Sequence, residues 1–255
     1  MIVIGVYNLK GGVGKTTTAV NLACRARREG RVLLWDLDPQ GAAGYSLGVA
    51  AAEGGSRRLA RGRVDLRSLV EPTRIPLLDL IPARFSYRKL DVLLSAAPRP
   101  RSFLRTLLKG ISADYEWVFL DCPPGIGVLS ENVFRAADLL LVPLLPSSMS
   151  LRSYQEIVVF LDRKGLDRSR LLPFFSMVEK RKKSHRDAIA AFSARETRVC
   201  RTTIPSSAVI ERSAATRRPP AHFRPSSAEG VAYSALWSEV RDAAAVAARS
   251  SHAVG

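Results

Sequence analysis

The most constraining feature of the sequence is a glycine-rich turn that follows the first apolar segment. The turn reads Lys10-Gly11-Gly12-Val13-Gly14-Lys15-Thr16-Thr17. Residues 2–7 form a short, nearly continuous apolar run, which is typical of a strand buried on both faces of a parallel sheet. Residues 16–29 have apolar side chains at helical spacing. A strand, a glycine-rich turn and a helix in this order form the setting in which phosphate-binding loops occur.

The residue types in this turn suit the binding of phosphate groups. Glycines let backbone N–H groups approach phosphate oxygens, and the start of the following helix adds partial positive charge. On this pattern Lys15 would reach the β- and γ-phosphates, and Thr16 would ligate Mg²⁺. The turn departs from the usual G-x-x-x-x-G-K-[ST] pattern, because Leu9 replaces the first glycine and a second lysine, Lys10, follows. The glycine turn of a dinucleotide-binding fold is the alternative, but that fold has no use for the Lys-Thr pair.

Carboxylates follow two of the later apolar runs. Residues 117–120 are apolar and end in Asp121, which is the Walker B arrangement, so Asp121 would bind the metal directly or through water. Asp36 and Asp38 follow the apolar run 32–35. Asp36 would support Mg²⁺, and Asp38 would polarise the attacking water. An isolated Asp-x-Asp pair more often indicates a turn or a helix cap, but its place after the second strand favours the catalytic interpretation.

Strand-like and helical segments alternate along the chain. Strands are predicted at residues 2–7, 32–35, 77–81, 117–120, 139–145 and 171–175. Helices are predicted at 16–29, 88–95, 101–111, 129–137, 151–164, 185–195 and 228–249. This alternation predicts an α/β fold with a mostly parallel, twisted sheet and helices on both faces. Residues 48–64 are interpreted as a surface excursion and 211–227 as a loop. Without a convincing linker or repeat, we expect a single domain over residues 1–255.

Composition excludes several classes of protein. The 255 residues carry 39 Lys+Arg and 23 Asp+Glu, a formal net charge of +16 that is spread along the chain. Three scattered cysteines exclude a disulfide framework and suit a reducing cytosol. His185, His222 and His252 lack metal-ligand spacing and are interpreted as surface residues. The sequence shows no signal peptide at its start and no uncharged run long enough to span a bilayer.

Two local groups of basic residues stand out from the diffuse charge. The first consists of Lys180, Arg181, Lys182, Lys183 and Arg186, and the second of Arg212, Arg217, Arg218 and Arg224. Both lie outside the apolar pattern, so we expect them to be exposed. Exposed cations of this kind bind the phosphates of DNA without reading its sequence. A solvated charged surface is the alternative interpretation.

Taken together, these segments resemble the ParA/MinD family of deviant Walker A P-loop ATPases, and most closely its small ParA-type, Soj-like partition ATPases. The resemblance rests on the lysine-first loop 10–17, the segment 36–41 (Asp-Leu-Asp-Pro-Gln-Gly) and Asp121-Cys122-Pro123-Pro124. A looser match is the segment 203–207, which is followed by Glu211-Arg212.

The resemblance implies ATP and Mg²⁺ as ligands, with residues 10–17 around the nucleotide. It also implies an ATP-sandwich homodimer, in which Lys10 reaches the partner's phosphates, since this lysine has no clear target in its own subunit. Asp38 falls on the family's water-activating position, and Pro205 falls in the element that borders the adenine. The family often has asparagine where this chain has Ser176 or Met177.

The implied cellular role is an ATP-dependent dimer that binds double-stranded DNA non-specifically in the nucleoid of the cytoplasm. A ParB-like or other partner would stimulate hydrolysis, so that DNA or another cargo is segregated or positioned. A MinD-like membrane-surface ATPase is one alternative, but the Ala-rich last helix lacks Phe, Leu and Lys after Val240 and is a poor interfacial helix. We therefore expect no stable membrane anchor. A nucleotide-dependent interaction module with incidental hydrolysis is the other alternative.

Overall fold

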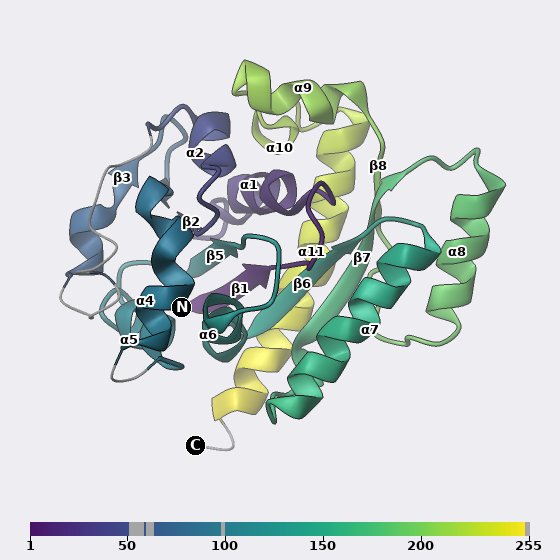
Figure 1. Ribbon diagram of the computed structural model, residues 1–255. Helices are drawn as coiled ribbons and strands as arrows, with labels where there is room; N and C mark the ends of the chain where they lie inside the picture. The colour runs from purple at the N-terminus through teal and green to yellow at the C-terminus, as the bar shows by residue number, and fades with distance from the viewer. Residues whose placement is uncertain (51–58, 60–63, 98–99, 253–255) are drawn as a thin grey trace.

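A central eight-stranded sheet organises the computed structural model, which describes residues 1–50, 59, 64–97 and 100–252 (Figure 1). The strand order is β3-β4-β2-β5-β1-β6-β7-β8, and all neighbouring strands are parallel except β3 and β4. The strands are β1 (Ile2–Val6), β2 (Val32–Asp36), β3 (Glu71–Pro72), β4 (Leu78–Ile81), β5 (Trp117–Asp121), β6 (Leu139–Leu144), β7 (Leu171–Val178) and β8 (Thr203–Pro205). The predicted mostly parallel sheet is confirmed.

Helices cover both faces of this sheet, as predicted (Figure 1). On one side lie α1 (Lys15–Ala26) and α11 (Ala228–His252), with α2 (Ala42–Leu47), α9 (Ala208–Thr216) and α10 (Pro220–Phe223) nearby. The other side carries α4 (Leu90–Ser95), α5 (Phe103–Lys109), α6 (Val128–Ala136), α7 (Ser148–Arg163) and α8 (Lys183–Ser193). Three short 3₁₀ helices complete the described elements: η1 (Leu66–Leu69), η2 (Phe85–Lys89) and η3 (Arg168–Arg170).

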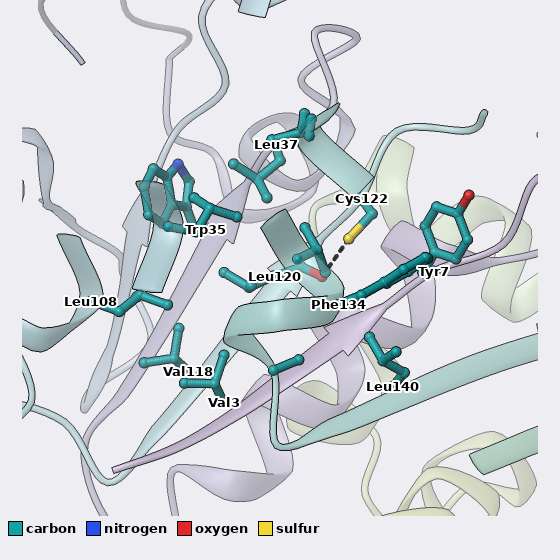
Figure 2. Close-up of a cluster of buried hydrophobic side chains, with 14 of the residues drawn as sticks. Val3, Tyr7, Trp35, Leu37, Leu108, Val118, Leu120, Cys122, Phe134 and Leu140 are labelled. Carbon is teal, nitrogen blue, oxygen red and sulfur yellow. Dashed lines mark hydrogen bonds between the residues drawn. The ribbon is translucent and has the colours of Figure 1, made fainter. Parts of the chain in front are cut away.

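Each face of the sheet packs its own apolar cluster, because successive side chains of a strand point to opposite faces. Figure 2 shows the cluster beneath α6, where the Tyr7 ring meets the Phe134 ring edge-on, with centroids 4.7 Å apart. On the other face, Trp237 of α11 meets Trp117 of β5 edge-on at 4.8 Å. All five residues of both β2 and β5 are buried, which explains why the four residues before the final aspartate of each strand are apolar.

The last helix is part of the core, as predicted. Leu236, Trp237 and Val240 of α11 are buried, and the Trp237 indole N–H donates to Glu29 Oε1 at 2.8 Å. Within the described residues, no helix combines the length and the apolar character that crossing a bilayer requires.

The prediction of a loop over residues 211–227 is wrong. This segment contains the end of α9 and the whole of α10. The helix α10 begins at Pro220, a residue well suited to a first helical position, and the Ala221 N–H donates to Asn21 Oδ1 of α1 at 3.0 Å. A tertiary contact therefore stabilises a segment whose own pattern is weak. Sequence analysis also missed the short elements α2, β3 and β8. Most of the predicted excursion at 48–64 lies outside the described residues.

Candidate nucleotide site

The glycine-rich turn connects β1 to α1 at the carboxyl edge of the sheet. Gly12 and Gly14 have φ angles of 70° and 90°, in the left-handed region that favours glycine. Gly14 directly precedes Lys15, the first residue of α1. A Cβ atom at Gly14 would also come within 3.0 Å of Ser176 Oγ, so the turn combines conformational strain with a close approach to β7. Both effects explain why this position requires glycine.

Lys15 is folded back across the turn. Its side chain is buried, and Nζ donates to the Lys10 carbonyl oxygen at 2.7 Å. Burial lowers the pKa of Lys15, while the nearby Asp121 carboxylate acts in the opposite direction. The ammonium group thus sits among the turn residues with a neutral carbonyl as its hydrogen-bond acceptor.

Lys10 has a contact that sequence analysis did not foresee. Its Nζ donates to the carbonyl oxygen of Met149, in the first turn of α7, at 2.8 Å. Its backbone N–H donates to Asn8 Oδ1 at 2.9 Å, and Asn8 Nδ2 donates to the Pro143 carbonyl oxygen at 2.7 Å. The expectation that Lys10 lacks a target in its own subunit is therefore wrong. The target is an exposed neutral carbonyl, which leaves the positive charge unneutralised.

Asp36 lies buried at the end of β2, directly beside Asp121 of β5 in the strand register. Its carboxylate accepts hydrogen bonds from the backbone N–H groups of Asp38 at 3.1 Å, Ala43 at 3.0 Å and Gly44 at 3.4 Å. Burial raises the pKa of Asp36 to about 7, despite these hydrogen bonds. Asp36 therefore links the end of β2 to the start of α2.

Asp121 is fully buried, and neither of its carboxylate oxygens has a hydrogen-bond partner among the described residues. Burial, together with the Asp36 charge, raises the pKa of Asp121 well above its usual value. The nearby Thr16 hydroxyl acts in the opposite direction on the pKa of Asp121, although the two side chains do not form a hydrogen bond. A buried acceptor without a partner is costly, and a carboxylate beside a hydroxyl is a donor set that Mg²⁺ favours. These residues therefore fit the metal that the phosphate loop implies.

A cavity of about 540 Å³ opens over the turn, a volume within the range of small-ligand sites. Seven of the predicted site residues line it: Gly11, Gly12, Gly14, Lys15, Thr16, Thr17 and Asp38. Pro39, Gln40, Arg88, Pro123, Pro124 and Met177 complete its described lining. Lys10, Val13 and Pro205 are not among these residues, and Val13 is buried in the core.

Sequence analysis missed Arg88 as a residue of the cavity. Arg88 belongs to η2, which follows β4, and its guanidinium lies 4.2 Å from the centroid of the exposed Phe85 ring. The sheet order places β4 beside β2, and this order brings Arg88 opposite the phosphate loop. The only available signal was its place just beyond an apolar strand.

The adenine assignment of Pro205 stays a prediction. Pro205 pairs with Val178 across β7 and β8, next to Met177, which does line the cavity. Met177 has a φ of 55°, a strained conformation for a residue with a side chain.

The basic residues predicted to be exposed are exposed in both groups. In the first group, Lys182 forms an ion pair with Glu179 at 2.6 Å, and Arg186 donates to two main-chain carbonyls. In the second group, Arg217 lies 5.4 Å from the centroid of the Tyr45 ring.

The three histidines do not gather at a site. His222 is half-buried and lies 2.9 Å from an Arg27 nitrogen, so the prediction of a plain surface residue is wrong there. His185 Nδ1 accepts from the Glu179 N–H, and the side chain of His252 lies outside the described part of the chain.

Comparison with known proteins places this geometry in a family. The sequence profile of a family described as "AAA domain" matches residues 1–166. The chain is 35% identical over 170 residues to the chromosome partitioning protein ParA of Myxococcus xanthus, covering 65% of this chain and 60% of that protein. It is 41% identical over 173 residues to the chromosome-partitioning ATPase Soj of Thermus thermophilus, covering 66% of each. The aligned region thus spans about three fifths of these relatives.

Solved structures extend the likeness to nearly the whole fold. A plasmid partition protein of Borrelia burgdorferi bound to AMPPNP gives a TM-score of 0.81 at 20% identity, covering 94% of this chain and 98% of that one. Cobyrinic acid a,c-diamide synthase of Mycobacterium smegmatis, with ADP and magnesium, gives 0.73 at 27% identity, covering 88% and 95%. The lysine-first phosphate loop, the carboxylates at the ends of β2 and β5, and these similarities show that the chain belongs to the ParA/MinD family of P-loop ATPases.

Proposed function

We propose that this chain is a ParA-like ATPase that binds ATP with Mg²⁺, forms a nucleotide-sandwich homodimer, and binds DNA non-specifically in the cytoplasm. A partner protein stimulates hydrolysis, and the cycle positions DNA or another cargo. The observation that carries the proposal is the convergence of Lys15, Thr16 and Asp38 on one cavity beside the unpartnered carboxylate of Asp121.

Nucleotide binding follows from groups that are already in place. The glycine turn offers backbone N–H groups, and Lys15 exchanges its contact with the Lys10 carbonyl for a phosphate oxygen, which carries a full negative charge. Thr16 and Asp121 would hold Mg²⁺, and Asp36 would support them from beneath through its backbone contacts. When bound, Mg²⁺ supplies neutralisation of the phosphate charge.

Asp38 is the residue that positions the attacking water. It is half-buried, lines the cavity, and accepts the Gln40 N–H at 3.0 Å, while its own N–H donates to Asp36. These two hydrogen bonds orient the segment toward the phosphate loop. A fixed carboxylate at this place orients water and polarises it without forming a covalent bond to the substrate.

In this proposal, Lys10 contributes to dimerisation. Its contact with Met149 is exposed and made to a neutral acceptor, so the terminal phosphates of a nucleotide in a facing copy offer a better partner. Each subunit would then contribute one cation to the site of the other. The names of the relatives ParA and Soj support partition as the cellular process.

The two alternatives lack a comparable observation. A membrane-surface function would need an apolar helix face free for lipid, whereas α11 buries Leu236, Trp237 and Val240 in the core. A pure interaction module would not need Asp38 in the cavity, and Asp38 is there.

The first prediction concerns hydrolysis. Asp38→Ala leaves ATP binding intact and lowers turnover by roughly 100-fold or more, because the water loses its orienting carboxylate. Turnover is measured by phosphate release and binding by fluorescence of a labelled ATP analogue. Gln40→Ala, at an exposed position of the same lining, is the control and keeps most of the activity. Wild-type turnover in the Asp38 variant would remove this residue from its role.

The second prediction concerns the metal. Wild-type protein with ATP gains thermal stability when Mg²⁺ is added, because a ligand that binds only the folded state stabilises it. Asp121→Asn loses that increment but keeps the stabilisation that ATP gives in excess EDTA. The exposed Asp162→Asn behaves as wild type. An unchanged Mg²⁺ increment in the Asp121 variant would contradict the assignment.

The third prediction concerns the dimer. A non-cleavable ATP analogue converts the wild-type monomer to a dimer in light scattering, whereas Lys10→Ala stays monomeric and still binds the analogue. Lys89→Ala, an exposed lysine on η2, serves as the control. A wild-type chain that stays monomeric when saturated with the analogue would refute the sandwich.

The fourth prediction concerns DNA. Lys182→Gln, Lys183→Gln and Arg186→Gln together weaken ATP-dependent binding to any duplex, and each lost phosphate contact reduces the salt slope by roughly 0.9. Fluorescence anisotropy at several salt concentrations measures both. Unchanged affinity would point to the group Arg212–Arg224 or to no DNA role for either group.

A further inference from the structure

Two adjoining hollows rich in arginine lie away from the nucleotide cavity. The first has a volume of about 720 Å³ and contains Arg101, Arg105, Arg135 and Arg170 in its lining. The second has about 490 Å³ and contains Arg168, Arg195 and Arg198. Asp167 lines both, so the two hollows adjoin at this residue. We refer to these seven arginines as the arginine band.

The arginine band lies toward the edge of the sheet opposite the phosphate loop. Arg135 is in the last turn of α6, just before β6, and η3 leads directly into β7. Arg195 and Arg198 lie between α8 and β8. All these residues precede the strands, whereas the phosphate loop, Asp36 and Asp121 stand where strands end. Figure 1 shows the end of α7 that leads toward β7 at the bottom, far from α2 and α9 at the top.

A buried carboxylate holds part of the arginine band in place. The Glu131 side chain is only 5% exposed and forms ion pairs with Arg101 at 3.3 Å, Arg135 at 2.9 Å and Lys164 at 3.0 Å. These three cations come from the segment before α5, from α6 and from the end of α7. One negative charge fixes three positive ones, so the surface is ordered while most of its charge remains available.

The other arginines of the band have no acidic partner within salt-bridge distance in the part of the chain that the structure describes: Arg105, Arg168, Arg170, Arg195 and Arg198. The two acids that line the hollows, Asp167 and Glu196, each accept hydrogen bonds from neighbouring lining residues. Asp167 accepts hydrogen bonds from the N–H and hydroxyl groups of Ser169, and Glu196 accepts from the Tyr154 hydroxyl and the Arg198 N–H. Against the seven arginines of the band, these two carboxylates leave the surface with a net positive charge.

The chemistry of the hollows favours a phosphate backbone over a protein partner. Among the described residues, the apolar lining side chains are buried or half-buried, as for Phe134 and Leu166, and no strongly exposed apolar side chain lies in either hollow. Protein interfaces rely on such apolar anchors, whereas interfaces with DNA are polar and strongly positive. Arginine forks match phosphate oxygens in pairs. Seven arginines also exceed what one small anion neutralises, so the charge suits a polymer of phosphates.

We propose that the arginine band binds the phosphate backbone of duplex DNA without reading its bases. This inference rests on the proposed function for the identity of the ligand. It differs in that DNA binding by the arginine band does not require nucleotide. The band lies away from the cavity at which two ATP-bound copies would meet, so a single subunit carries a complete band without nucleotide. In the sandwich dimer the two bands would face outward at opposite ends.

The test uses nucleotide-free protein and a short labelled duplex of random sequence. Arg105→Gln, Arg168→Gln and Arg195→Gln are combined, because all three are exposed and form no salt bridge in the described structure, so folding is unaffected. We expect anisotropy to show affinity lowered roughly tenfold or more near 0.1 M salt, with the salt slope reduced by about 2 to 3. The matched control, with the same change of charge, combines Arg28→Gln, Arg74→Gln and Arg249→Gln and binds as wild type.

Each other outcome decides the question. Equal binding by the band variant and wild type overturns the proposal. The proposal is also overturned if the band variant loses binding to immobilised polyglutamate but binds the duplex as wild type does. That result would assign the arginine band to an acidic polypeptide. The experiment distinguishes failure of this proposal from failure of the proposed function. If wild-type protein binds DNA only with ATP, the role of the arginine band is refuted and the proposed function is not. DNA binding that ATP does not increase, yet that the band variant loses, supports the band and refutes the ATP-dependent switch.

Discussion

The burial of two carboxylates side by side is the constraint on which the site depends. Parallel pairing of β2 with β5 places Asp36 and Asp121 next to each other, out of water, where burial raises the pKa of both and the Asp36 charge further raises the pKa of Asp121. The fold stabilises one of them, because backbone N–H groups from the start of α2 bind Asp36. The other, Asp121, has no hydrogen-bond partner in the part of the chain that the structure describes. This asymmetry separates a carboxylate held by backbone N–H groups from one that would hold the proposed Mg²⁺ ion.

The two lysines of the turn likewise have incomplete electrostatic partners. Lys15 and Lys10 each donate to a main-chain carbonyl, and neither forms an ion pair with a carboxylate of the described residues. The phosphates of the proposed nucleotide complex would therefore compete well for both lysines. The contact of Lys10 with Met149 also joins the phosphate loop to the first turn of α7.

The local part of this architecture could be predicted from the sequence, and the part made by strand order could not. The glycine turn, the apolar strands and the carboxylates after β2 and β5 are each contained in a few consecutive residues. Arg88 enters the cavity only because β4 pairs with β2, and the Met149 partner of Lys10 depends on where α7 starts. The local sequence around α10 indicates a loop. The helix forms there because a contact with Asn21, 200 residues away in the chain, stabilises it. Diffuse arginines gave no local signal at all, although the fold gathers seven of them.

The distribution of these cations bears on how a basic protein can still be a switch. The groups at Lys180–Arg186 and Arg212–Arg224 already share hydrogen bonds and ring contacts with their surroundings, and dimerisation would double the phosphate contacts that they make. The arginine band, in contrast, lies at the far edge of the sheet, where nucleotide has no direct contact. A surface of this kind would retain a subunit weakly on DNA between cycles, since binding to one backbone segment adds few phosphate contacts. Closure of the dimer would then join two such surfaces into one body, and joined sites bind far more tightly than separate ones without any new contact. The nucleotide would thus control the residence of the protein on DNA by controlling how many weak surfaces are connected.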